Sequence, residues 1–221
     1  MKKKTLNIRS SRAVLSRPIR SKVNARTSQK ANEAQVSQKT TVLEYLFEKG
    51  IDIENRCITI SEDVDSGLFK KVDAAMSMFE KDNARKTVTV KINSDGGLVS
   101  EALAVVARLR RSTCHIVTEG YGSIMSSATL ILACGDKRMI SEYATLMHHE
   151  SSEYFAEDTR ISQSQLEHFT AHTKREEKRW ANWMARFTKR DAAFWIEKGK
   201  LLDEYMFPEQ CLECGVVDEV F

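Results

Sequence analysis

The sequence predicts an α/β domain built on a largely parallel sheet. Short apolar or β-branched segments alternate with segments whose apolar residues recur at helical spacing, a pattern typical of parallel α/β sheets. The chain has 221 residues, of which 42% are hydrophobic, and this suits one such domain with an appendage. No internal repeat is visible in the sequence.

The expected strands are brief and rich in apolar or β-branched residues, as in the TVTVKI segment. They cover residues 57–60, 87–92, 114–118, 137–140 and 144–148. The expected helices place apolar residues on one face, as the spacing of Leu68, Val72 and Phe79 illustrates. They cover residues 42–48, 65–80, 99–109, 126–133, 161–187 and 208–214, the last beginning at a proline, which a first helical turn tolerates.

Residues 1–40 differ in composition from the rest, and we expect them to form a basic, disordered tail ahead of a domain over residues 41–221. Residues 1–41 contain eleven lysines and arginines and one acid, Glu33, which gives a net charge of +10. Because the whole chain carries +3, the remainder carries −7. Three interpretations fit the tail: a solvated segment, an electrostatic contact with nucleic acid, or an Arg-rich and Ser-rich organelle transit peptide.

The sequence also bears on compartment and cofactors. No apolar run approaches the ~20 residues that a membrane-spanning helix needs, so we expect a soluble protein without membrane contact. Five cysteines, an odd number, favour a reducing cytoplasm, with organelle import as the alternative if the tail is a transit peptide. Cys211 and Cys214 form a lone CxxC, which more often packs in a core than binds zinc. We therefore expect no metal and no other cofactor.

Three segments place reactive groups next to strand ends. The turn over residues 93–97 has two adjacent glycines, whose backbone N–H groups can approach an anion closely. Ser126 begins a helix, where a serine is more often a cap than a nucleophile, although the helix dipole there stabilises negative charge. His148 and His149 are adjacent on a strand and therefore point to opposite faces, so one can enter a site while the other packs or faces solvent.

Taken together, these segments make residues 56–221 resemble the proteolytic subunit of the ATP-dependent Clp protease family, including its shorter phage-type members. INSDGG is similar to the family's INSPGG turn, and GSIMSSAT with LILACGDKRMI to its nucleophile segment and the following strand. ATLMHH is similar to the strand that ends in the catalytic histidine, and EQCLECGVVDEV to the closing segment. The resemblance implies a crotonase-like α/β fold of repeated β-β-α units, with a protruding handle helix within residues 150–188.

The resemblance implies a serine peptidase in which Ser126 is the nucleophile and His149 is its base. Ser123 and Ser127 compete for the first role, but aligning the apolar helix that follows selects Ser126. The oxyanion-hole donors fall on the backbone N–H groups of Gly97 and Ser127. Such a site binds the tetrahedral oxyanion with two backbone donors, each of which is worth roughly 3 kcal/mol.

The triad acid has several candidates. An ungapped alignment places Gly199 where the family has its aspartate. We expect Asp203, which keeps an acid-x-aromatic pattern ahead of the final helix, and place Glu197 second; Asp191 and Glu204 are also near. If all four are surface acids, the enzyme has a Ser–His dyad or a weakly oriented histidine.

Two further departures from the family lie close to the site. Asp95 replaces a proline in the glycine turn, and two extra residues precede the nucleophile segment near Gly120. Proline restricts the backbone, so its replacement leaves that turn less rigid.

The resemblance also implies partners. These are a peptide or unfolded-protein substrate, further copies of the chain in stacked rings that enclose the sites, and a AAA+ unfoldase that carries the ATP. The large apolar residues within 161–187 are typical of an interface. The alternatives are a phage-type maturation protease without an unfoldase, a non-catalytic structural subunit, and an enoyl-CoA hydratase relative, which the Ser–His pair disfavours.

Overall fold

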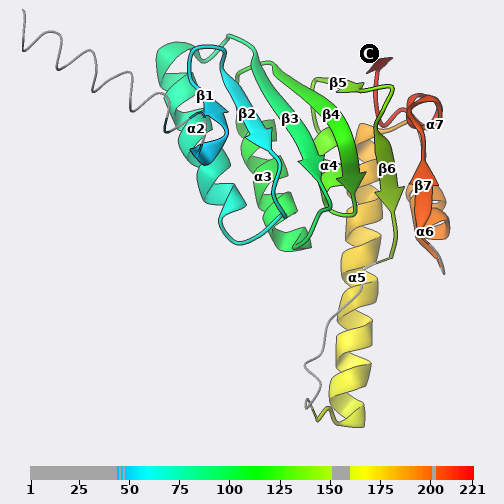
Figure 1. The fold of residues 1–221 in the computed structure, drawn as a ribbon. Coiled ribbons are helices and arrows are strands. Elements are labelled where there is room, and N and C mark those ends of the chain that lie inside the picture. The colour runs from blue at the N-terminus through cyan, green and yellow to red at the C-terminus, as the bar shows by residue number, and fades with distance from the viewer. Residues whose placement is uncertain (1–43, 45, 47, 151–159, 201–202) are drawn as a thin grey trace, which may run out of the picture. The chain divides into compact units, whose positions relative to one another are not determined.

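An eight-stranded sheet organises the unit formed by Val42–Phe221 (Figure 1). The computed structural model describes residues 44, 46, 48–150, 160–200 and 203–221. The predicted tail over residues 1–40 lies outside the described residues, as does most of the helix predicted over residues 42–48. No helix in the described ranges has the length and apolar character required to cross a membrane.

The sheet has a continuous path and one branch. Along the path the order is β1-β2-β3-β4-β5-β8, formed by Ile51–Asp52, Cys57–Ile60, Val88–Ser94, Ile116–Met125, Lys137–Ile140 and Glu219–Val220. Strand β4 pairs with β5 through its first half and with β6 (Thr145–His148) through its second half. Strand β7 (Glu204–Met206) extends this branch. All pairs are parallel except β1 with β2 and β6 with β7.

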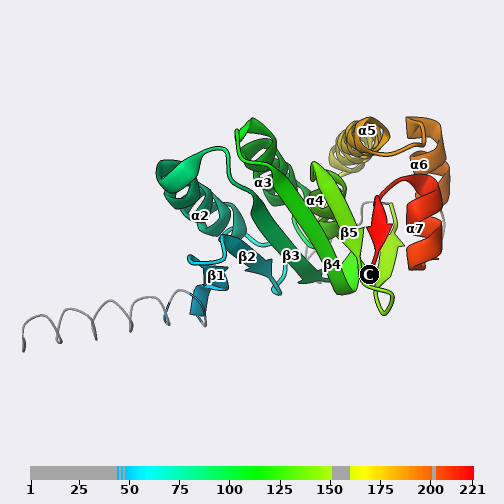
Figure 2. The same cartoon turned by 90° about the horizontal axis from the view of Figure 1, so that it is seen from above.

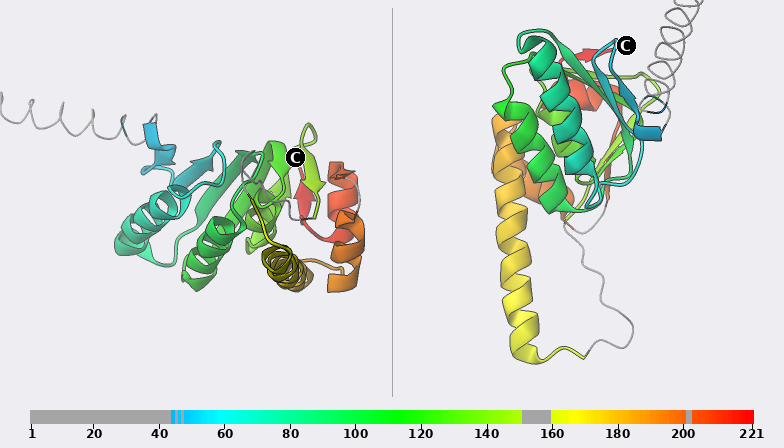
Figure 3. Two further views of the ribbon diagram at one scale, coloured as in Figure 1. Left: turned by 90° about the horizontal axis from the view of Figure 1, so that it is seen from below. Right: turned by 90° about the vertical axis from the view of Figure 1, so that its left-hand side faces the viewer.

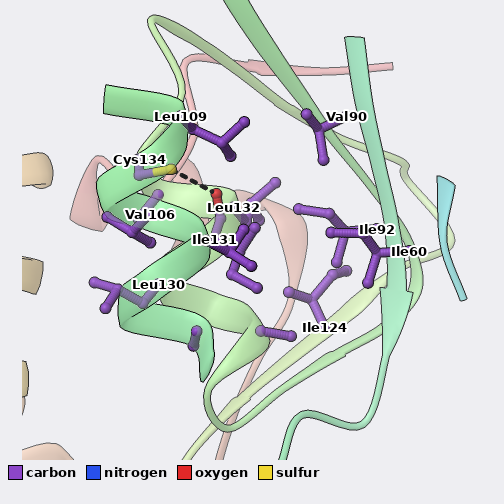
Figure 4. Close-up of a cluster of buried hydrophobic side chains, with 14 of the residues drawn as sticks. Ile60, Val90, Ile92, Val106, Leu109, Ile124, Leu130, Ile131, Leu132 and Cys134 are labelled. Atoms are coloured by element: carbon purple, nitrogen blue, oxygen red, sulfur yellow. Dashed lines mark hydrogen bonds between the residues drawn. The ribbon is translucent and has the colours of Figure 1, made fainter. Parts of the chain in front are cut away.

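Three helices, α2 (Leu68–Asn83), α3 (Val99–Arg111) and α5 (Gln163–Phe187), lie on one side of the sheet (Figure 2). The short helix α4 (Ala128–Ala133) is fully buried and packs between α3 and the sheet, with Leu130, Ile131 and Leu132 pointing into the core (Figure 4). A side chain of this size gains about 1.5–3 kcal/mol when fully buried, so α4 is firmly anchored. Helices α6 (Ala192–Gly199) and α7 (Pro208–Cys214) complete the fold next to β7 (Figure 1).

Helix α5 extends well past the end of the sheet (Figure 3). Its Ser162 N-cap forms a capping box with Gln165, which satisfies backbone N–H groups at the helix start. Its buried residues, Trp180, Ala181 and Met184, all lie in the second half. The helix predicted over residues 161–187 is thus confirmed, while its role as a handle stays a prediction.

A bulge in β4 accommodates the two extra residues that the sequence shows near Gly120. Ile92 pairs with Gly120, but Ser94 pairs with Ile124, so β4 has two more residues than β3 between these pairs. The side-chain oxygen of Asn93 accepts a hydrogen bond from the Ser123 N–H at 2.9 Å and closes the gap. The bulge therefore leaves the later part of β4 in register with β6.

The strand and helix pattern of the sequence is largely confirmed, with several differences. Strand β4 starts two residues later than predicted and continues to Met125, because the bulge keeps a glycine-containing segment in the sheet. The sequence analysis missed four elements: β1, α6, β7 and β8. The repeated β-β-α units stay a prediction.

Arg56 ties the end of α2 to the sheet. Its guanidinium donates hydrogen bonds to the carbonyl oxygens of Phe79 at 2.8 Å, Asn83 at 2.9 Å and Thr87 at 3.1 Å. It also forms an ion pair with Asp82 at 3.0 Å, and its side chain is only 9% exposed. The arginine therefore joins the C-terminal part of α2 to the residue that precedes β3 through their carbonyl groups.

We expect Arg56→Met to lower the free energy of unfolding by about 3 kcal/mol, because it leaves several carbonyl groups without their donor. Urea denaturation followed by circular dichroism measures the change. Lys86→Met, which removes an exposed cation from the same region, is the matched control and should change stability by less than about 0.5 kcal/mol. Equal effects of the two substitutions would contradict this role of Arg56.

Candidate active site

Ser126 stands on a strained turn between β4 and α4. Its φ angle is +50°, in the left-handed region that residues other than glycine rarely adopt. The turn is held from both sides: the Ser126 N–H donates to the Met147 carbonyl oxygen of β6 at 2.8 Å, and the Ser126 carbonyl oxygen accepts from Thr129. Strain of this kind persists only where the surroundings fix it, and it is common at functional sites.

His149 follows the last residue of β6 and faces this turn. Its Nε2 atom lies 2.8 Å from the Ser126 Oγ atom, which is hydrogen-bond distance. The contact follows from the sheet, because β6 pairs with the end of β4 and the turn bonds to Met147 two residues before His149. The two residues predicted as nucleophile and base are therefore in direct contact.

His148, the neighbouring histidine, points into the core. Its Nε2 atom lies 2.8 Å from the carbonyl oxygen of Trp195, and its ring stacks on Trp180 with centroids 4.3 Å apart. Burial lowers the pKa of His148 to about 4, so the ring is neutral at pH 7 and donates its Nε2–H to Trp195. The opposite orientations of the two histidines agree with the alternation expected along a strand.

The glycine turn after β3 lies against the Ser126 turn. A Cβ atom on Gly96 would lie 2.8 Å from the Ser126 Cβ and 2.5 Å from the Met125 carbonyl oxygen, so only glycine fits. Val64 fixes the turn by donating its N–H to the Gly96 carbonyl oxygen and accepting from the N–H of the residue after Gly97, both at 2.8 Å. The turn is therefore rigid despite its glycines.

The predicted oxyanion donors both line the same groove as the serine. The backbone N–H groups of Gly97 and Ser127 have no acceptor within the described part of the chain, although their neighbours are paired. Ser127 also directly precedes α4, where the partial positive charge of the helix terminus favours an anion. These two amides are thus available to a ligand in the groove.

No acid supports His149 in the described ranges, where no carboxylate oxygen lies within 4.0 Å of its ring nitrogens. The predicted triad acid Asp203 is exposed. The other candidates have other roles: Glu197 pairs with a lysine at 2.7 Å, Glu204 pairs with another lysine, and Asp191 caps α6. Within the described residues, the structure brings the serine and the histidine together, but it brings no acid to them.

The backbone of Gly199, rather than an acidic side chain, lies next to the two histidines. The Gly199 carbonyl oxygen accepts from the Glu150 N–H at 3.0 Å, so the end of α6 lies directly against the chain after β6. A Cβ atom on Gly199 would lie 2.8 Å from the His148 Nε2 and 3.2 Å from the His149 carbonyl carbon. Gly199, which the alignment placed at the family's aspartate, therefore leaves no room for a side chain.

The serine and histidine lie in a groove of about 930 Å³. Its lining comes from the loop before α2, the glycine turn, the Ser126 turn, the end of β6 and one face of α5. The α5 residues that line it are His172, Thr173, Glu176, Glu177 and Trp180. The sequence analysis missed this contribution, because spacing along α5 does not show which segment the helix faces.

The cysteine pair plays no part in the groove. Cys211 and Cys214 are buried in α7, and burial raises the pKa of Cys211 to about 12, which keeps the thiol protonated. Within the described ranges, no group of three or more histidines, cysteines or acids is placed to hold a metal ion.

Residues 42–221 match the family model for Clp protease. The ATP-dependent Clp protease proteolytic subunit 1 of Corynebacterium jeikeium is 28% identical over 170 residues, which cover 76% of this chain and 88% of that protein. The ATP-dependent Clp protease proteolytic subunit 2 of Rhodococcus jostii is 28% identical over 173 residues, which cover 76% of this chain and 85% of that protein. The chain therefore belongs to the Clp protease family.

His148 makes stability depend on pH. Its folded pKa of about 4 lies below the ordinary value of 6.5, so between these values the unfolded chain binds a proton that the folded chain excludes. The stabilisation is fully present above pH 6.5 and is lost as the pH falls toward 4, by up to about 3 kcal/mol. Urea denaturation at pH 7, 6, 5 and 4 measures it.

His148→Gln, which can still donate to the Trp195 carbonyl oxygen, should flatten this pH dependence. His168→Gln on the exposed part of α5 is the control and should keep the wild-type slope. If His148→Gln keeps that slope too, another group causes the pH dependence.

Proposed function

We propose that this member of the Clp protease family is a serine endopeptidase, in which Ser126 attacks the peptide carbonyl and His149 takes its proton. The observation that carries the proposal is the 2.8 Å contact between Ser126 Oγ and His149 Nε2 on a strained turn inside a groove. A serine hydroxyl is a weak nucleophile until an adjacent base accepts its proton, and this contact supplies the base.

The mechanism then follows from the groups around the serine. As Ser126 Oγ bonds to the carbonyl carbon, its proton moves to His149 Nε2, and the N–H groups of Gly97 and Ser127 stabilise the oxyanion. The protonated histidine gives the proton to the leaving amine, which breaks the peptide bond and leaves an acyl group on Ser126. A water molecule, deprotonated by the same histidine, releases the acyl group and restores the serine.

We propose that the site works as a Ser–His dyad rather than a triad. His149 must carry its remaining proton on Nδ1 to accept at Nε2, and no described carboxylate is close enough to fix that tautomer. The residue in the place of the family's acid is Gly199, whose surroundings exclude a side chain. Asp203 and Glu197 would then influence the histidine only through longer-range electrostatics.

We further propose that copies of the chain assemble into stacked rings that enclose the grooves, and that a AAA+ unfoldase delivers substrate to them in the cytoplasm. The support lies in α5, whose first half extends from the sheet with Leu166 51% exposed (Figure 3). Helices gain most of their stability from packing, so a protruding amphipathic helix favours a partner. A phage-type maturation protease that needs no unfoldase is the alternative.

The assembly predicts a sedimentation coefficient far above that of a 25.2 kDa monomer at micromolar concentration. Leu166→Glu should shift the protein toward smaller species, because a buried unpaired charge disfavours an interface. Lys174→Glu, another exposed position on α5, is the control for the added charge. A monomeric wild type in analytical ultracentrifugation would refute the ring.

The catalytic proposal predicts labelling by a fluorophosphonate probe in the wild type and its loss in Ser126→Ala and His149→Ala. Hydrolysis of a peptide substrate should fall at least about a thousandfold in both variants, because nucleophile and base act as a unit. Ser123→Ala is the matched control: among the described residues the Ser123 hydroxyl makes no hydrogen bond, and the backbone N–H bond to Asn93 is kept, so labelling should persist. Absence of labelling in folded wild type would instead favour a non-catalytic subunit.

In a Ser–His dyad the nearby acids Asp203 and Glu197 take no direct part in catalysis, so their substitution is a second control in the same assay. Asp203→Asn and Glu197→Gln should change the hydrolysis rate by less than about threefold, whereas removing the acid of a true triad costs about 10⁴-fold. A large loss in either variant would identify that residue as the third member of the site.

A further inference from the structure

We infer that the groove around Ser126 selects peptides that carry lysine or arginine side chains near the bond to be cut. The inference rests on the proposed function and adds its substrate class. The acidic side chains lining the groove are Asp63, Asp65, Asp95, Glu176 and Glu177, and no lysine or arginine among the described residues lines it.

The acids come from separate parts of the chain and surround the serine. Asp63 and Asp65 belong to the loop before α2, and Asp95 belongs to the glycine turn next to the Ser126 turn. Glu176 and Glu177 lie on α5, which begins 37 residues after Ser126 and forms another part of the lining. A peptide in the groove therefore meets negative charge from several elements rather than from one loop.

Most of these carboxylates have no cationic partner in the described part of the chain. Glu176 pairs with Arg179 at 3.5 Å, but no lysine or arginine nitrogen lies within 4.0 Å of the other four. Asp65 accepts only a backbone hydrogen bond, from Gly67 at 2.8 Å. Burial and the nearby Glu150 raise the pKa of Glu177, and the opposing effect of Lys200 and Lys174 is smaller. A bound cation would relieve this repulsion.

A second observation points to a ligand in the same groove. The Ser127 hydroxyl is buried, with the residue only 2% exposed, and it has no hydrogen-bond partner among the described residues. A buried hydroxyl without a partner is unfavourable, so such groups usually meet a ligand or a water molecule. Because Ser127 lines the groove beside the proposed nucleophile, a peptide backbone placed for attack is a suitable partner.

The charged and titratable groups near the acids are three histidines, Glu150, and the lysines Lys174 and Lys200, which act on Glu177. His149 and His172 line the groove, and His148 borders it from the core side. The proposed mechanism requires a neutral His149, which adds no positive charge to the groove. Cationic substrates are therefore attracted under the same conditions in which the base is able to act.

A binding experiment tests the inference independently of catalysis. The full-length Ser126→Ala protein is titrated against two fluorescein-labelled decapeptides, one with three lysines and one with glutamines in their place, and anisotropy is measured at 50 mM and 300 mM salt. The lysine peptide should bind at least about tenfold more tightly at low salt, and its advantage should shrink at high salt because the charges are screened.

Neutralising the groove should abolish that preference. In the Ser126→Ala background, Asp63→Asn, Asp95→Asn and Glu177→Gln are combined; none of these side chains makes a hydrogen bond or ion pair within the described residues. The matched control removes the same charge from exposed sites outside the groove, by Glu54→Gln, Glu209→Gln and Glu213→Gln. The preference for lysine should be lost in the first variant and kept in the second.

The outcomes separate this inference from the proposed function. Equal binding of the two peptides, or equal loss of preference in the two triple variants, overturns the inference even if the wild type hydrolyses peptides. Selective binding of the lysine peptide that depends on the groove acids supports it, and does so even if the wild type cuts neither peptide, in which case the proposed function fails. Hydrolysis of the lysine peptide with a higher kcat/KM than the glutamine peptide supports both.

Discussion

The structure of the site depends on one constraint, the left-handed turn at Ser126. The turn joins the end of β4 to α4, whose burial fixes one side, and its N–H bonds to Met147 of β6, which fixes the other. The same backbone bond sets His149 two residues further on at hydrogen-bond distance from the serine hydroxyl. Gly96 must then lack a side chain, because any Cβ would overlap the turn. The buried helix α4, the pairing of β6 with β4 and the glycine turn therefore all fix the position of Ser126.

The sequence predicts those elements and motifs that depend on residues close together in the chain. Helical spacing and β-branched segments predict most elements, and an ordered set of motifs selects Ser126 and His149, whose side chains lie 2.8 Å apart in the structure. The missed strands β1, β7 and β8 have two or three residues each, too few for a period, and exist only because a neighbouring strand pairs with them. Helix α6 did have a local signal in Asp191, whose side chain caps it.

The site contains features that no local pattern could predict. Whether an acid meets His149 depends on where α6 ends, and the close approach of Gly199 to β6 involves residues about 50 positions apart. The acidic groove likewise combines acids from three separate segments, each of which contributes one or two. In both cases the relevant quantity is a distance between remote segments, whereas composition and spacing report only on neighbours along the chain.

The lack of an acid beside His149 among the described residues and the acidic groove bear on the same step of the proposed mechanism. There His149 becomes a cation when it takes the serine proton, and a triad would stabilise this cation with one hydrogen-bonded carboxylate. In a dyad, that stabilisation has to come from carboxylates that do not touch the ring, such as those of the groove. Charge acting at a distance stabilises the imidazolium but cannot select its tautomer, because it has no directional bond to Nδ1. It is also weakened by salt, whereas a buried contact is screened much less.

A basic substrate would neutralise part of the negative charge of the groove on binding. The groove would thus attract its substrate with the same charge that supports its base, so tight binding and fast proton transfer would oppose each other.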